Sequence, residues 1–301
     1  MRRPSTVELM LLATVLLWAL NLSVSRYLLT HGLQPLPYAV LRYGGAAAIF
    51  LALALLAERT LRVRRADLPL AALAAAALTV NQLSFVYALD LTTASTVGLV
   101  LGAVPIATAL LGLVLGTERA SGRFWLAALV SALGVGLVAA GAGSGISADL
   151  AGVLLGLATA STWAAYSVAV APLMARYSPV RISAAVLPAA WAALGAIGAP
   201  QAASQEWSLG WEAWALLAFA TLGPLVVTNV LWFRSVHRIG ANRATLAANL
   251  QPFVAAVLAV ALLREPLSPL QVAGGALIAG AILLARRRRR GGAPARLESA
   301  A

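Results

Sequence analysis

Long apolar stretches alternate with short charged gaps along this 301-residue chain. A helix rises 1.5 Å per residue, so about 20 apolar residues are needed to cross the hydrocarbon core of a bilayer. Ten stretches approach that length. They are Val7–Leu29, Tyr38–Ala57, Leu68–Leu89, Ala94–Leu115, Phe124–Ala140, Leu150–Pro172, Ile182–Ala199, Trp211–Phe233, Ala244–Leu263 and Leu270–Ala285. Because backbone groups in lipid must be bonded within their own segment, the pattern predicts an all-α polytopic membrane protein with ten transmembrane helices.

Composition supports this class. Apolar residues make up 61% of the chain and charged residues only 11%, whereas a soluble domain carries roughly 25% charged residues. The chain has no cysteine, which excludes disulfides, thiolate metal sites and thiol nucleophiles.

The net charge of +12 comes from arginine alone and follows membrane topology. If the N-terminus is cytoplasmic and the ten spans alternate, 19 of the 22 arginines lie on the cytoplasmic side, and only Arg26, Arg42 and Arg264 lie in the outer half. This asymmetry predicts that both termini are cytoplasmic. It also argues against a nucleic-acid partner, because the charge sits between spans and not on one basic face.

The chain contains an internal repeat, which we consider before its chemistry. The residues Asn81, Phe85, Ala94, Pro105 and Glu118 recur as Asn229, Phe233, Ala241, Pro252 and Glu265, at offsets of 148 for the first two and 147 for the others. The pair Trp18-Ala19 recurs 145 residues later as Trp163-Ala164. We therefore predict one five-helix unit at residues 1–145, a second at 146–290, and a disordered cytoplasmic tail at 291–301.

An odd number of spans per unit inverts the second copy in the membrane. Inverted repeats are the architecture of many secondary transporters, in which the substrate site lies near the bilayer midplane between the halves. The repeat therefore predicts alternating access through a central cavity.

Several short patterns resemble the drug/metabolite transporter superfamily, and more narrowly the EamA-type exporters. They are Trp18-Ala19-x-Asn21, Leu41-Arg42, Tyr87-Ala88-Leu89, the series Ala94, Pro105 and Glu118, and the glycines Gly134 and Gly136. The second copy departs from the first at Pro266, where the first has Arg119, and it has no match to Arg42. The resemblance implies ten helices around a central cavity, a bacterial inner (plasma) membrane, and export of small metabolites, including amino acids.

Helical phase selects candidate substrate contacts, since residues three and four apart share a face. The candidates are Trp18, Asn21, Asn81, Ser84, Trp163, Tyr166, Asn229, Asn249 and Gln251. Aromatic and amide side chains suit a solute with an apolar ring or chain and a polar head. The alternative for the amides is hydrogen bonding between helices, and Asn229 has a gate or interface role as a further alternative.

Two prolines and one arginine each have more than one possible role. Pro105 and Pro252 occupy matching positions inside spans and are candidate hinges, although prolines kink many membrane helices. For Arg42 we expect the guanidinium to extend outward to the interface; the alternative is a gate or a contact with a substrate carboxylate. Trp207, Trp211 and Trp214 are typical of the interfacial aromatic belt.

Some chemistry is missing from the predicted spans. All ten acidic residues fall at span ends or outside the membrane, and neither histidine lies mid-span. A buried carboxylate is the usual proton relay of a coupled transporter, so we expect facilitated diffusion or exchange. There is no ATP-binding GxxxxGK[ST] pattern, no candidate metal site, no implied cofactor and no catalytic constellation, so an enzyme is not expected.

These features predict a monomeric membrane carrier, surrounded by lipid, that exports small metabolites such as amino acids or similar amphiphilic solutes. A multidrug or nucleoside-type efflux carrier of the same fold, and a non-transporting membrane scaffold, are the alternatives.

Overall fold

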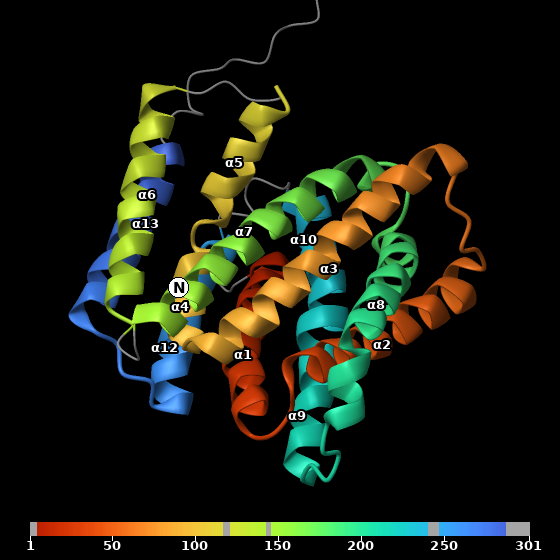
Figure 1. Cartoon of the computed structure of the whole chain (residues 1–301). Helices are drawn as coiled ribbons and strands as arrows, with labels where there is room; N and C mark the ends of the chain where they lie inside the picture. The colour runs from red at the N-terminus through yellow and green to blue at the C-terminus, as the bar shows by residue number, and fades with distance from the viewer. Residues whose placement is uncertain (1–4, 117–120, 143–145, 240–246, 287–301) are drawn as a thin grey trace, which may run out of the picture.

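The computed structural model describes residues 5–116, 121–142, 146–239 and 247–286, and within them the only regular structure is helical (Figure 1). The predicted tail at 291–301, Glu118 and Ala241 lie outside the described residues. The α-helices are α1 (Thr6–Thr30), α2 (Pro35–Leu53), α3 (Leu68–Leu91), α4 (Ala94–Leu101), α5 (Val104–Val114), α6 (Gly122–Ala140), α7 (Ile146–Met174), α8 (Pro179–Ser204), α9 (Trp211–Thr221), α10 (Thr228–Ile239), α12 (Gln251–Leu263) and α13 (Pro269–Arg286). Single turns of other helix types are η1 (Ala54–Glu58), η2 (Arg65–Asp67) and η3 (Leu222–Val227).

Within the described residues, seven helical segments are long and apolar enough to cross a membrane, or eight if the bent pair α4–α5 is one span. Two further apolar helices, Gln251–Leu263 and Pro269–Leu284, are shorter than that test requires. The all-helical, multi-pass class is therefore confirmed, while the number ten depends on how these two short helices are counted.

Prolines mark a helix start or a change of helix type in three of the predicted spans. Pro105 and Pro252 occupy the first turn of α5 and of α12, a position where the missing N–H costs nothing. Helices α4 and α5 meet at an angle of 41°. Pro224 lies in the π-helical turn η3, which joins α9 to α10. The two candidate hinges therefore begin helices and do not kink continuous ones.

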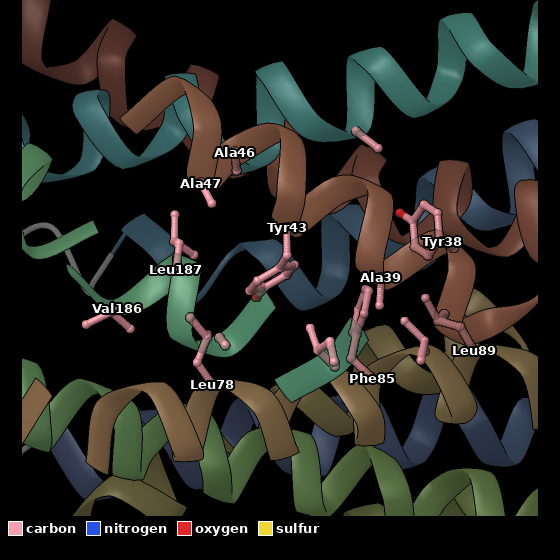
Figure 2. Packing of buried hydrophobic residues seen from close by; sticks show 14 of the residues in the cluster. Tyr38, Ala39, Tyr43, Ala46, Ala47, Leu78, Phe85, Leu89, Val186 and Leu187 are labelled. Atoms are coloured by element: carbon pink, nitrogen blue, oxygen red, sulfur yellow. The ribbon is translucent and has the colours of Figure 1, made fainter. Parts of the chain in front are cut away.

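The two sequence repeats pack against each other along most of their length. Helix α2 packs on α8, α3 on α7, α4 on α12, and α1 on both α10 and α12. Large side chains fill the α2–α3–α8 region, where Tyr38 and Tyr43 are fully buried (Figure 2). Phe50, also on α2, is fully buried as well. Burial of such aromatic rings accounts for much of the packing energy of a core.

Helices α6 and α13 lie side by side at one edge of the bundle (Figure 1). Their contact is made by backbone: a Cβ atom added at Gly134 would lie 2.7 Å from the carbonyl oxygen of Gly274. Small residues permit such close approach between membrane helices.

Candidate functional site

An aromatic cluster lies where the two repeats meet. The Trp18 ring on α1 contacts the Trp163 ring on α7, edge to face, with centroids 6.5 Å apart. Trp18 also contacts Trp232 on α10 at 5.3 Å, and Trp163 contacts Tyr166 at 5.4 Å. Trp18 and Trp163 are equivalent positions of the two repeats, so the cluster joins one unit to the other.

The π-helical turn of the eighth predicted span fixes the Trp18 ring. The Trp18 indole Nε1 donates to the Thr228 hydroxyl at 2.9 Å and lies 3.3 Å from the Pro224 carbonyl oxygen. Sequence phase places Thr228 and Trp232 on one face of a helix, but it does not show that this face meets Trp18. The structure therefore adds Thr228 and Trp232 to the candidate site.

Two amides near the cluster carry unpaired acceptors. Asn21 on α1 is 7% exposed, and its Oδ1 atom has no hydrogen-bond partner. Asn229, on α10 beside α1, also has a buried Oδ1 without a partner. A buried polar atom left unbonded costs about 1–3 kcal/mol, so these oxygens would be stabilised by donors of a bound solute.

Asn81 instead joins two helices. Its Nδ2 donates to the Thr159 carbonyl oxygen at 2.8 Å and to the Thr162 hydroxyl at 3.3 Å, and its Oδ1 accepts from Gln82 at 3.1 Å. These bonds match the alternative of hydrogen bonding between helices. Ser84, also buried, donates to the Val80 carbonyl oxygen of its own helix.

The remaining candidates lie at the start of α12. Asn249 and Gln251 are half-buried, and Pro252 is buried against α4. At Gly98 of α4, an added Cβ would lie 3.5 Å from the Pro252 carbonyl oxygen. Pro252 thus packs on α4, and α4 is followed by α5, which has Pro105 in its first turn. The two candidate hinges therefore belong to neighbouring elements.

Arg42 does not extend outward, and that expectation was wrong. Its side chain is 3% exposed, because α2 packs against α8 and α9 at this level. Its Nε donates to the Ala220 carbonyl oxygen at 3.4 Å, and its guanidinium lies 5.0 Å from the centre of the Tyr38 ring. Pro224 has no N–H with which to bond that carbonyl four residues earlier, so the oxygen is left for Arg42.

One end of the repeat interface, which we call the arginine end, consists of the α2–α3 and α7–α8 connections. A cavity of about 390 Å³ there is lined by Arg62, Arg64, Arg176, Tyr177 and Arg181. The described residues contain two ion pairs, Asp67–Arg176 and Glu58–Arg181, and both join the repeats at this end.

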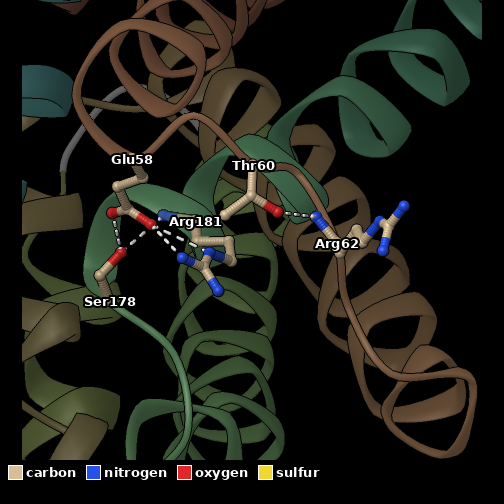
Figure 3. A network of polar contacts seen from close by, with 5 residues as sticks. All are labelled: Glu58, Thr60, Arg62, Ser178 and Arg181. Carbon is tan, nitrogen blue, oxygen red and sulfur yellow. Dashed lines mark hydrogen bonds and ion pairs between the residues drawn. The ribbon is translucent and has the colours of Figure 1, made fainter.

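Hydroxyl groups complete these pairs. Tyr177 donates to Asp67 at 2.7 Å and accepts from the Arg64 backbone N–H at 3.0 Å. Ser178 donates to Glu58, whose other oxygen accepts from Arg181 Nε at 2.9 Å (Figure 3).

The opposite end, which we call the glutamine end, is joined by neutral amides. Gln205 accepts from the Gln34 backbone N–H at 2.8 Å and donates to the Gly32 carbonyl oxygen at 2.9 Å. Gln201 accepts from the Leu36 backbone N–H at 3.0 Å and donates to the Tyr87 hydroxyl at 2.9 Å.

Glu265 also lies at a junction of the two repeats. Its carboxylate accepts from the backbone N–H groups of Ala94 and Ser95, both at 2.9 Å, and from the Ser95 hydroxyl at 2.8 Å. A carboxylate at a helix N-terminus is favoured by the helix dipole. The repeated glutamate of the second unit therefore caps α4 of the first.

The site offers rings, amides and one buried cation, which are groups that can bind a small molecule. Among the described residues, no group of three or more His, Cys, Asp or Glu side chains is placed to hold a metal ion.

Comparisons with known proteins agree with the helical architecture. A solved structure described only as the crystal structure of a protein has a TM-score of 0.62 with this chain, at 22% identity over 94% of this chain and 97% of its own. At that identity the likeness bears on the fold alone. No curated protein matches the chain.

The family comparison covers nearly the whole sequence. The model of the EamA-like transporter family matches residues 5–140 and again residues 150–287. This confirms the two-repeat architecture and the resemblance predicted from the sequence. The chain is a multi-pass membrane protein and belongs to the EamA-like transporter family.

Proposed function

We propose that this transporter exports small amphiphilic metabolites, amino acids foremost, by alternating access between its two repeats. The observation that carries the proposal is the contact between Trp18 and Trp163, equivalent residues of the two units whose rings meet edge to face. A solute seated there touches both halves, so a rocking motion of one half against the other exposes it to either side.

The chemistry of this region favours an amphiphile. The Trp18, Trp163, Tyr166 and Trp232 rings provide apolar and π surface. Unpaired oxygens of Asn21 and Asn229 provide acceptors for an ammonium or amide donor. Ring stacking beside a few well-placed polar groups is typical of small-molecule sites.

The proposed topology counts α12 and α13 as the ninth and tenth spans. With ten spans the second unit is inverted, both termini face the cytoplasm, and the arginine end lies on the cytoplasmic side of a cell inner membrane. In this arrangement the ion pairs close the cytoplasmic side, and the amides of Gln201 and Gln205 close the outer side.

We further propose a uniport or exchange mechanism without enzymatic activity or an obligatory buried proton relay. Asp67 is buried, but it lies at the arginine end in its pair with Arg176, away from the aromatic cluster. Strict dependence of net flux on a pH gradient in proteoliposomes would contradict this part of the proposal.

Counterflow in proteoliposomes tests the function. Proteoliposomes that contain the purified protein are loaded with unlabelled solute, and the entry of labelled amino acids, purines and sugars is measured. We expect saturable counterflow of amino acids. Counterflow of purines alone would instead support the nucleoside-type carrier, and the absence of counterflow for every solute would favour a scaffold.

Single substitutions test the site within the same assay. Trp18→Ala and Trp163→Ala should each lower counterflow at least tenfold while the purified protein remains monodisperse. Trp211→Ala is the matched control, because Trp211 is highly exposed at the start of α9. Normal counterflow by both site variants would remove the aromatic cluster from the pathway.

A further inference from the structure

The Arg42 guanidinium is a buried cation without an anion. It takes part in neither of the two ion pairs of the described residues, and its Nη1 atom has no hydrogen-bond partner. Arginine stays protonated in proteins, so it cannot escape burial by losing its charge. The contacts it does have are to neutral groups: one long bond from Nε to the Ala220 carbonyl oxygen, a side-chain hydrogen bond with Tyr38, and the face of the Tyr38 ring.

Those contacts leave the charge only partly compensated. A buried charge is ordinarily paired as well as hydrogen-bonded, because desolvation costs several kcal/mol per ion. In a membrane segment, an ionisable residue marks a substrate or ion pathway by default. No carboxylate of the described residues pairs with Arg42, which leaves the place of its counter-ion open to an anion from outside the chain.

The position of Arg42 connects it to the aromatic cluster. Its acceptor, the Ala220 carbonyl, lies four residues before the Pro224 carbonyl that Trp18 approaches, on the same helical stretch. At 1.5 Å per residue the two carbonyls are about 6 Å apart along the axis. That span matches an amphiphile with a ring at one end and a charged head at the other.

The geometry points to Arg42 as the residue that binds the carboxylate of the transported solute, with its side chain or ring against Trp18 and Trp163. This rests on the proposed transport function and narrows the substrate class to carboxylate-bearing amphiphiles. A guanidinium binds a carboxylate through parallel N–H donors, and the unpaired Nη1 is available for that second bond.

Because Nη1 is buried, we expect the carboxylate to bind only in a conformation that uncovers Arg42. Arg42 of α2 bonds to Ala220 near the end of α9, and a rearrangement at the π-helical turn η3 would uncover it. Single π-turns occur frequently at functional sites, which agrees with this location.

The test compares a carboxylate with its neutral amide. In wild-type proteoliposomes, L-phenylalanine and L-phenylalaninamide compete against each labelled amino acid that the panel finds to be transported. We expect L-phenylalanine to compete at least tenfold better. In Arg42→Gln this preference should vanish through weaker competition by L-phenylalanine, while Arg42→Lys should retain part of it.

Arg26→Gln is the matched control, because Arg26 carries the same charge as Arg42 and lies in the same predicted outer half of the membrane. Arg26 is satisfied without any acid, because its Nη1 donates to the carbonyl oxygens of Leu89 and Asp90. It should keep the wild-type preference. Thermal unfolding and size-exclusion profiles of all three variants separate loss of recognition from loss of fold.

Each result has one reading. An unchanged preference in Arg42→Gln, or equal weakening of both competitors, assigns Arg42 a purely structural role and overturns the inference. Transport of purines or sugars without any carboxylate-bearing solute also overturns it while leaving transport itself intact. If wild type shows no counterflow at all, the proposed function fails first, and this inference fails with it.

Discussion

The two ends of the repeat interface are joined by different chemistry. At the arginine end, Asp67 and Glu58 of the first unit pair with Arg176 and Arg181 of the second. At the glutamine end, Gln205 forms neutral hydrogen bonds to the α1–α2 connection, and Gln201 forms one to the first turn of α2. A charge-assisted bond is worth roughly twice a neutral one, so we expect the arginine end to be the stronger closure. The following changes test that difference, and the absence of native cysteine makes a single Ser84→Cys reporter possible.

Asp67→Ala should have the largest effect. Asp67 is 1% exposed and accepts from both Arg176 and Tyr177. Because the Arg176 side chain is 51% exposed and can rehydrate, we expect a loss of about 2 kcal/mol. Labelling of the Ser84→Cys reporter by an impermeant maleimide in inside-out vesicles should then accelerate about tenfold or more. Arg65→Gln, an exposed charge outside both ion pairs, is the control; equal acceleration there would contradict the specific closure.

Glu265→Gln should have the next largest effect, at the opposite side of the protein. It weakens three hydrogen bonds at the N-terminus of α4, with an expected loss of about 1–2 kcal/mol. Reporter labelling in right-side-out vesicles should rise several-fold. The exposed Glu212, in the first turn of α9, provides the control substitution Glu212→Gln. If both variants behave alike, the capping contact does not hold the outer side closed.

Gln201→Ala should act on the same side and more weakly. It removes two neutral hydrogen bonds, to Leu36 and Tyr87, each worth about 1 kcal/mol net and partly replaced by water. Outer labelling should increase two- to fivefold, and labelling from the cytoplasmic side should not change. Ser208→Ala in the neighbouring exposed connection is the control. A larger effect than that of Asp67→Ala would reverse the comparison between the two ends.

Added salt should change reporter labelling least, and it should distinguish the arginine end from the glutamine end without any substitution. Raising the ionic strength to about 0.5 M shortens the screening length to a few ångströms and weakens partly exposed ion pairs. Cytoplasmic labelling should rise by about twofold, and outer labelling should rise less, because the charged group on that side is the single part-buried carboxylate of Glu265. Parallel increases on both sides would show that the closures do not differ in their electrostatics.

The helical architecture was accessible from the sequence because its causes are local. Apolar runs determine which segments enter lipid, and Pro105 and Pro252 mark helix starts because a missing N–H acts within one turn. The repeat also allowed Trp18 and Trp163 to be chosen together, and the structure brings their rings into contact.

Other features depend on partners far along the chain. The acceptor of Arg42 lies 178 residues away, so helix phase alone could not show that the side chain turns inward. Asn81 and Asn229 occupy equivalent positions and looked alike in sequence, yet only Asn81 meets a carbonyl and a hydroxyl on the facing helix. The pairing of Asp67 with Arg176 spans 109 residues and follows from which connections meet, not from the charges themselves.

The glycine contact between α6 and α13 limits how the protein can move. With no side chain between the two backbones at Gly134 and Gly274, the pair has no rotamers to exchange. A methyl group added at Gly134 would lie 2.7 Å from the Gly274 carbonyl oxygen, so a side chain at this crossing would push the two backbones apart. We therefore expect this crossing to stay fixed in the proposed rocking motion, while the helices that carry the aromatic cluster move relative to it.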